Sequence, residues 1–397
     1  MKKIYTLAIF AYLLLTACQK AQIAHTLDQS RDVPWADSSN NHPKNAAFRD
    51  LLEKYKTKGL PGISLLVNDK NGTWVGSTGY ADIEKKIPFR VGQVAKIASI
   101  TKLFMGTLVF KMIEDSVNTG IGYNSLYDPI TKWLPSRITD KLPNGKLITL
   151  GQCMKHETGI PDVIDEDKFY LAVLNNPVKK WEQEELLEII YGKAPVFAPG
   201  DTAIYSNTNT IIVSLILEAA TGKKHEDLLK EYLLHPLALS QTFYQPYDQL
   251  PANTAQGYFD LYNNNTIVNV SNLVTGSGNG YGGLYSDVFD LYSFIDRLLI
   301  KKTILTQKSL TTMETYGKPD FPNQYGYGIM KKFIDRGEDA GVGHSGRDLG
   351  YSANLFYFQN KGVTHAFLVN YGTAGDSNLK KVFEEFQDEL LDLTLKP

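Results

Sequence analysis

Cysteine is scarce in this sequence, and neither sign of charge dominates it. The 397 residues include two cysteines, Cys18 and Cys153, and carry a formal net charge of −2. Two cysteines cannot form the dense disulfide framework of a small secreted domain, and a lone Cys153 is typically a small buried hydrophobe. Without a basic excess, no nucleic-acid partner is expected. A chain of this length with 43% hydrophobic residues can bury a large core.

Two common hydrolase motifs are also missing. The sequence holds no Gly-x-Ser-x-Gly, which excludes the nucleophile elbow of an α/β-hydrolase. It holds no His-Glu-x-x-His, which removes the common zinc-peptidase pattern. We therefore expect neither a metal nor a cofactor.

The N-terminus has the layout of a secretion signal. After a positively charged start, the apolar run 7–15 is too short to span a bilayer. It ends in Leu15-Thr16-Ala17-Cys18, which resembles the lipobox of bacterial lipoproteins. This predicts a signal peptide over 1–17 and a lipid on Cys18, and the alternative is an ordinary secretory signal. We expect a lipid-anchored protein of the bacterial cell envelope, periplasmic or at the outer membrane, with the leaflet left open.

The next segment, residues 18–43, is polar and rich in serine and asparagine. It predicts a flexible, solvated tether. The folded domain is expected over 44–395.

Periodicity along that domain predicts an α+β fold. Apolar residues at helical spacing and alternating runs bounded by turn residues define the elements. Helices are expected over 45–57, from Ser99 onward, and over 182–191, 210–220, 226–234 and 377–391; strands are expected over 62–67, 73–80, 328–333, 351–359 and 364–370. Strands at both chain ends bracket a mainly helical lobe of about 110–270. We therefore expect one antiparallel sheet built from both ends and flanked by helices.

Two Ser-x-x-Lys patterns occur, and their surroundings differ. Ser377 and Lys380 begin a polar-faced helix, where a serine is explained as an N-cap. Ser99 and Lys102 begin a strongly apolar helix, which places both side chains on one buried face. Burial disfavours the charged form of a lysine, so Lys102 can act as a base near neutral pH. The alternative is that Ser99 is only a cap and Lys102 is solvated.

Two further motifs could complete such a site. Tyr205-Ser206-Asn207 precedes an apolar helix, and an ammonium nearby would favour the Tyr205 phenolate as a base. Asn207 can donate to a substrate carbonyl and accept from a lysine at once. Gly343-His344-Ser345-Gly346 precedes a strand, where Gly346 would permit close approach of a ligand. The backbone N–H of Arg347 could pair with that of Ser99 as an oxyanion hole.

The order of these three motifs resembles the serine β-lactamase and DD-peptidase superfamily, in the branch of class C β-lactamases, D-alanyl-D-alanine carboxypeptidase-like enzymes and related esterases. The resemblance covers about 45–395 and implies a β-lactamase/transpeptidase-like fold. Supporting stretches are Gly79-Tyr80-Ala81-Asp82, His156-Glu157-Thr158-Gly159-Ile160-Pro161 and Gly282-Gly283-Leu284-Tyr285-Ser286.

The resemblance also implies roles for the site residues. They are Ser99 as nucleophile, Lys102 as its activating partner, Tyr205 as general base and then acid, Asn207 as the group that orients the substrate amide, His344 and Gly346 as the lining of the substrate strand, and Arg347 as an oxyanion donor. Three residues depart from the family pattern. His344 replaces the lysine of true β-lactamases, Glu157 replaces a small hydroxyl residue, and Arg347, often glycine, would add a positive group at the site mouth.

The expected function is hydrolysis through an acyl-enzyme on Ser99, acting on D-amino-acid peptides or related amides. An esterase or β-lactamase of the same family is the first alternative. A non-catalytic lipoprotein that binds peptide or β-lactam is the second. The expected partners are thus a small peptide, ester or β-lactam, and a membrane through the Cys18 lipid.

Overall fold

The computed structural model describes residues 25–29, 37–373 and 375–396 of the chain. One nine-stranded antiparallel sheet forms its centre, in the order β3-β2-β1-β14-β13-β12-β11-β10-β9. Its strands are β1 (Gly62–Asp69), β2 (Gly72–Asp82), β3 (Ile87–Pro88), β9 (Pro319–Asp320), β10 (Asn323–Tyr325), β11 (Met330–Lys332), β12 (Gly341–Asp348), β13 (Tyr351–Phe358) and β14 (Val363–Val369). Smaller sheets contain β4 (Ala95–Lys96), β8 (Leu284–Ser286) and β5 (Phe243–Tyr244), and β6 (Tyr258–Phe259) and β7 (Val268–Asn269).

The sheet joins the two ends of the chain. β1 from the N-terminal part pairs antiparallel with β14 from the C-terminal part, with Leu65 opposite Phe367. β1 and β2 form a hairpin around Asn71-Gly72, and the backbone φ of +110° at Gly72 suits glycine. The expected α+β fold with a sheet built from both ends is confirmed.

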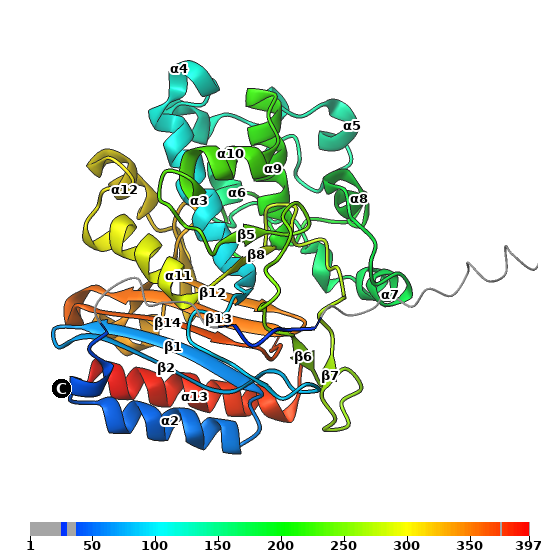
Figure 1. The fold of residues 1–397 in the computed structure, drawn as a ribbon. Coiled ribbons are helices and arrows are strands. Elements are labelled where there is room, and N and C mark those ends of the chain that lie inside the picture. The colour runs from blue at the N-terminus through cyan, green and yellow to red at the C-terminus, as the bar shows by residue number, and fades with distance from the viewer. Residues whose placement is uncertain (1–24, 30–36, 374, 397) are drawn as a thin grey trace, which may run out of the picture.

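Two long helices, α2 (Asn45–Thr57) and α13 (Asn378–Leu395), cover one face of this sheet (Figure 1). α2 has the predicted bounds and buries Phe48, Leu51, Leu52 and Tyr55. Ser377 caps α13 by accepting a hydrogen bond from the Lys380 N–H. The role expected for the second Ser-x-x-Lys pattern is therefore confirmed.

The other face carries a mainly helical lobe (Figure 1). Its helices are α3 (Thr101–Glu114), α4 (Ser116–Thr119), α5 (Ser136–Thr139), α6 (Leu150–Met154), α7 (Asp167–Asn175), α8 (Gln183–Glu188), α9 (Asn207–Thr221), α10 (His225–Leu229), α11 (Val288–Ile295) and α12 (Gln307–Met313). Helical structure thus continues beyond residue 270, where the lobe was expected to end. α3 passes through the main hydrophobic core and buries residues on every side, including Lys102.

The expected tether is wrong for its described part. Thr26 is buried, and its backbone N–H donates to Asp82 while its hydroxyl donates to the Thr254 carbonyl. Ser39 is also buried, and its hydroxyl donates to the Val75 carbonyl. Residues 25–29 and 37–43 therefore lie against the folded domain, because side-chain and backbone hydrogen bonds hold them there.

Cys18 and the expected signal peptide lie outside the described residues. Cys153 is free and buried, as expected, and burial raises the pKa of its thiol. Among the described helices, none combines the length and apolar character needed to cross a bilayer.

Candidate active site

Ser99 lies at the junction of the sheet and the lobe. A short 3-10 turn, η2 (Ala98–Ile100), holds it directly before α3, and Ser99 is only half-buried. Ala98 has a backbone φ of +48°, a region that residues other than glycine rarely adopt. The strained residue immediately before Ser99 turns the chain sharply into α3 and is typical of a functional site.

Lys102 lies one helical turn after Ser99 and is buried. Its Nζ is 3.1 Å from Ser99 Oγ, 2.7 Å from Asn207 Oδ1 and 2.6 Å from the Tyr281 carbonyl oxygen. The Asn207 and Tyr281 oxygens can only accept, so in a neutral amine they accept hydrogen bonds from its two N–H groups. The remaining lone pair of that amine then faces the Ser99 hydroxyl. This geometry lets a neutral lysine accept the serine proton, and the same three contacts would equally satisfy the three N–H bonds of an ammonium.

The surroundings of Lys102 also favour the neutral form. Burial lowers its pKa to about 7, while the carboxylates of Asp162 and Asp348 oppose this shift. A substantial fraction of Lys102 is therefore an uncharged base near neutral pH.

Asn207 connects Lys102 to a buried carboxylate. Asp162 Oδ2 accepts from both the backbone N–H of Asn207, at 2.9 Å, and its Nδ2, at 2.8 Å. Burial raises the pKa of Asp162 to about 6, and the N–H of Asn207 and the charge of Lys102 lower it again. Asn207 accepts from the lysine as predicted, but one of its two amide protons is already committed to Asp162.

Tyr205 places its ring beside the amine, with Lys102 Nζ 4.9 Å from the ring centroid. Its hydroxyl is buried and makes no hydrogen bond that meets the usual distance and angle limits with a described residue. The nearby Ser99 hydroxyl still favours the phenolate and lowers the pKa of Tyr205 in part. Burial dominates and raises the pKa of Tyr205. The expected phenolate is therefore wrong for the resting site, where Tyr205 is a neutral phenol that can donate a proton.

His344 lies on β12, and its side chain is buried beneath the site. Its Nδ1 is 2.6 Å from the Ser345 carbonyl oxygen, an acceptor, so Nδ1 carries the proton. Burial and the nearby Lys102 lower the pKa of His344 to about 3. The imidazole is neutral, so His344 cannot supply the charge of the lysine it replaces.

Gly346 lies against the chain that carries Ser99. A Cβ at this position would lie 2.0 Å from the Ile97 carbonyl oxygen and 3.2 Å from Ser99 N. The close approach predicted at Gly346 is therefore made by the protein's own backbone. The pairing of β11 with β12 ends at Gly343, so along residues 344–348 no described strand pairs with that edge of β12.

Arg347 follows Gly346, which places its backbone N–H next to the Ser99 peptide. Its side chain leaves β12 on the face opposite Gly346, because successive residues alternate along a strand, and Lys332 and Glu384 interact with its charge. Arg347 also belongs to the lining of the pocket beside Ser99. The expected positive group at the site mouth and the oxyanion role of the backbone N–H therefore both stay predictions.

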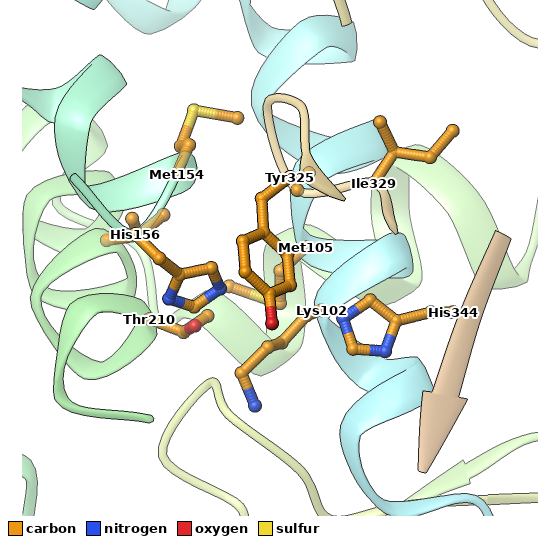
Figure 2. A pocket seen from close by; sticks show the side chains of 11 residues that line it. Lys102, Met105, Met154, His156, Thr210, Tyr325, Ile329 and His344 are labelled. Carbon is orange, nitrogen blue, oxygen red and sulfur yellow. The ribbon is translucent and has the colours of Figure 1, made fainter. Parts of the chain in front are cut away.

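Two histidines and a tyrosine surround a small cavity on the far side of Lys102. Figure 2 shows the imidazoles of His156 and His344 on either side of the Tyr325 ring. The His156 ring stacks on Tyr205 at 4.5 Å between centroids, and its Nδ1 accepts from the Ser206 N–H at 3.2 Å. His156 thus holds the Tyr205 segment in place, and burial lowers its pKa well below that of a free histidine.

Ser99 opens on its other side into a second pocket. Aromatic and aliphatic side chains form one wall, from Ile164, Phe169 and Tyr170. Thr275 and Asp348 also line this pocket, and Asp348 is paired with Lys96 at 2.5 Å. This pocket is where a substrate carbonyl can reach Ser99.

Sequence reasoning missed three contributors to the site. His156 lies in a stretch already noted for its resemblance, but nothing there assigned it a role. Asp162 directly follows that stretch, and its sequence context does not distinguish it from a surface aspartate. Tyr281 contributes its backbone carbonyl, for which no side-chain pattern exists.

Comparison with known proteins identifies the family. The family model Beta-lactamase matches residues 46–384, and the family and its relatives indicate a serine hydrolase. The chain belongs to the Beta-lactamase family.

Its relatives include several hydrolases. D-alanyl-D-alanine-carboxypeptidase/endopeptidase AmpH of Escherichia coli K12 is 25% identical over 291 residues, which is 71% of each chain. A D-stereospecific amidohydrolase from a Streptomyces species is 26% identical, with a TM-score of 0.72 over 86% of this chain and 98% of that one. D-amino acid amidase from Ochrobactrum anthropi SV3 shares the fold, with a TM-score of 0.75 and 24% identity over 88% of this chain and 98% of that one. The match to Protein flp of Staphylococcus aureus spans 40% of that protein and 52% of this chain.

Proposed function

We propose that this protein hydrolyses amide bonds of D-amino-acid peptides or related amides through an acyl-enzyme on Ser99. The observation that carries the proposal is the arrangement around Lys102. Its amine lies 3.1 Å from the Ser99 hydroxyl, and its other two partners accept hydrogen bonds only. A lysine held in this way is ready to take a proton from one atom, Ser99 Oγ.

Acylation then follows from the positions of the groups. Ser99 Oγ bonds to the substrate carbonyl carbon as its proton passes to Lys102 Nζ. The oxyanion that forms lies between the backbone N–H groups of Ser99 and Arg347. When the carbon–nitrogen bond breaks, the leaving amine takes a proton from the neutral Tyr205 phenol, which Lys102 reprotonates. Tyr205 therefore acts first as acid in this proposal.

Deacylation uses the same groups in reverse. A water molecule loses a proton to the base and bonds to the acyl carbon. The ester bond to Ser99 breaks, Ser99 Oγ regains a proton, and a carboxylic acid is released. Atoms and charges balance with water as the second reactant.

The choice of substrate class rests on the relatives and on His344. AmpH is named as a D-alanyl-D-alanine carboxypeptidase, and the Streptomyces protein as a D-stereospecific amidohydrolase. The neutral His344 lacks the charge of a β-lactamase lysine, which argues against a dedicated β-lactamase. The pocket beside Ser99 is lined partly by aromatic and aliphatic side chains, which would suit an apolar acyl side chain of the substrate.

The test is a substrate profile with two variants. The purified protein is given a D-Ala-D-Ala peptide, D- and L-phenylalanine amides, a nitrophenyl ester and a chromogenic cephalosporin. We expect turnover of the D-configured amides, with kcat/KM at least ~10³-fold lower in Ser99→Ala. Ser377→Ala is the matched control, because Ser377 caps α13 and bonds to the Tyr371 hydroxyl without touching Lys102, and it should retain full activity.

Other outcomes select other functions. Rapid ester turnover without any released D-amino acid would favour an esterase. Ligand binding without turnover or adduct would favour a non-catalytic binding protein. Unchanged amide hydrolysis in Ser99→Ala would overturn the mechanism.

We also propose that the protein is anchored in the cell envelope by a lipid on Cys18. The support is the lipobox-like run that ends at Cys18. Expression with a labelled fatty acid should mark the wild-type protein and leave Cys18→Ser unlabelled. Equal labelling of both would refute the anchor.

A further inference from the structure

We propose that Asp162 is a positioning residue for this reaction, which fixes the orientation of the Asn207 amide and balances the charge of Lys102. The inference rests on the proposed function, because it assigns how the base for Ser99 is held ready. Asp162 makes no hydrogen bond to Ser99 among the described contacts, and it contacts the pocket wall through the backbone N–H of Ile164.

The two carboxylate oxygens of Asp162 have separate partners. Oδ1 accepts from the Ile164 N–H at 3.2 Å and caps the short turn η5 (Val163–Asp165). Oδ2 accepts both bonds from Asn207, one from the backbone N–H and one from Nδ2. A cap for a three-residue turn needs only the first oxygen. The second oxygen serves Asn207 alone, so Asp162 does more than end a turn.

This arrangement allows Asn207 a single orientation. With Nδ2 bound to Asp162, the Asn207 carbonyl oxygen faces Lys102 Nζ at 2.7 Å. A flipped amide would turn its N–H donors toward the lysine donors and its oxygen toward the carboxylate, losing two hydrogen bonds. Asp162 therefore ensures that Lys102 meets an acceptor at Asn207, which leaves its lone pair for Ser99.

The charge of Asp162 acts on the same lysine. The ionisable groups that face Asp162 are Lys102 on α3, Asp165 on η5, Tyr170 on α7, and Tyr205 and Tyr281 beside the amine. Lys102 is the one cation among them, and burial raises the pKa of all three tyrosines, which keeps them neutral. A buried carboxylate beside a buried amine holds the proton on that amine more firmly. Asp162 thereby keeps Lys102 from losing its proton at too low a pH.

Two substitutions separate the roles of geometry and charge. Asp162→Asn keeps an oxygen that can accept from Asn207 and removes the negative charge. Asp162→Ala removes both. Asp165→Asn is the matched control, because Asp165 lies three residues away and makes no hydrogen bond to Asn207 among the described contacts.

The readout is the rate at which a fluorophosphonate labels Ser99 between pH 5 and pH 9, measured by mass spectrometry of the intact protein. This probe needs the activated serine but no knowledge of the natural substrate. We expect the acidic limb of the Asp162→Asn profile to lie about 1 pH unit lower than wild type, since Lys102 loses its proton more easily. Asp162→Ala should label about tenfold more slowly at its optimum, because the Asn207 amide is free to flip. Asp165→Asn should match wild type.

The outcomes separate the two proposals. Labelling that persists in Ser99→Ala would overturn the proposed function. Labelling that depends on Ser99, with the acidic limb of Asp162→Asn unchanged or with an equal shift in Asp165→Asn, would overturn the inference alone. If Asp162→Ala does not fold, the pH profile of Asp162→Asn still decides.

Discussion

In the proposed mechanism, the protonation state of Lys102 determines whether Ser99 can be activated. Burial lowers the pKa of Lys102 to about 7, and two carboxylates limit that shift. A fully exposed lysine would stay protonated in neutral solution and could not accept the serine proton. The apolar helix that buries Lys102 therefore produces the base.

The first prediction concerns the pH profile. Activity requires neutral Lys102, so kcat/KM should fall as the pH drops below about 7. His344 should not contribute a second limb there, because its pKa of about 3 keeps it neutral throughout. A profile that is flat from pH 5 to pH 8 would contradict the role of Lys102.

The second prediction separates the acid from the base. Tyr205→Phe should reduce amide turnover by about 10²-fold or more and nitrophenyl ester turnover much less, because a nitrophenolate leaves without a proton. The measurement is the ratio of kcat values on the two substrates. Tyr316→Phe is the matched control. The Tyr316 hydroxyl is also buried and has no hydrogen-bond partner among the described residues, but Tyr316 lines a different pocket. Equal losses on both substrates in Tyr205→Phe would argue against proton donation.

At the scale of elements, the contact between β12 and η2 sets the distance from Ser99 to the oxyanion donors. Gly346 makes this contact possible because it has no Cβ to collide with the Ile97 carbonyl. The sheet and the helical lobe meet at this point, so a shift of either one changes the site.

The third prediction tests that contact. Gly346→Ala should push β12 away from η2 and lower kcat/KM by about 10²-fold, the cost of a displacement near 1 Å. Circular dichroism should show a retained fold. Gly362→Ala, in the turn between β13 and β14 with open space around it, should cost some stability and leave activity intact. Wild-type activity in Gly346→Ala would show that the contact does not position the site.

The same scale shows what sequence reasoning could predict. α2 was predicted to the residue because four apolar side chains recur on one face. A helix was also expected over 210–220, and α9 ends at Thr221, before Gly222 with its backbone φ of +69°. α11 was not predicted, although it leaves Tyr292 and Ser293 partly exposed and buries its other residues, as an amphipathic helix does. Its N-cap, Asp287, was the signal available.

The site divides in the same way. Ser99, Lys102 and Asn207 were predicted to meet, and their side chains do. The Tyr205 phenolate was wrong because the degree of burial, which decides the pKa, cannot be read from a local motif. The direction of the Arg347 side chain depends on strand register, which the motif does not specify either.

At the scale of the whole molecule, the described residues 25–29 and 37–43 pack against the domain. Asp82 is fully buried and accepts from His25 Nδ1 at 3.0 Å, the Thr26 N–H and the Lys85 N–H. Although burial opposes them, these hydrogen bonds lower the pKa of Asp82. A chain anchored at its N-terminus would thus reach the domain through a docked segment beside β2.

The fourth prediction tests this docking. Asp82→Asn should lower stability by about 1–3 kcal/mol, because three donors lose a charged acceptor. The lowered pKa means that this stabilisation is present above the unfolded pKa of Asp82 and is lost as the pH falls through its folded pKa. Thermal unfolding at pH 7 and at acid pH gives the measurement. The difference in melting temperature between wild type and Asp82→Asn should become smaller at acid pH. A difference that stays the same would contradict this account.

The central claim is a covalent bond to Ser99, and the most direct measurement is peptide mapping of enzyme quenched in acid during turnover of a nitrophenyl ester. The account predicts an added acyl mass on the peptide that contains Ser99, absent from Ser99→Ala and unaffected by Ser377→Ala. Steady turnover with no adduct on Ser99, or with the acyl group on Ser377 instead, would contradict it.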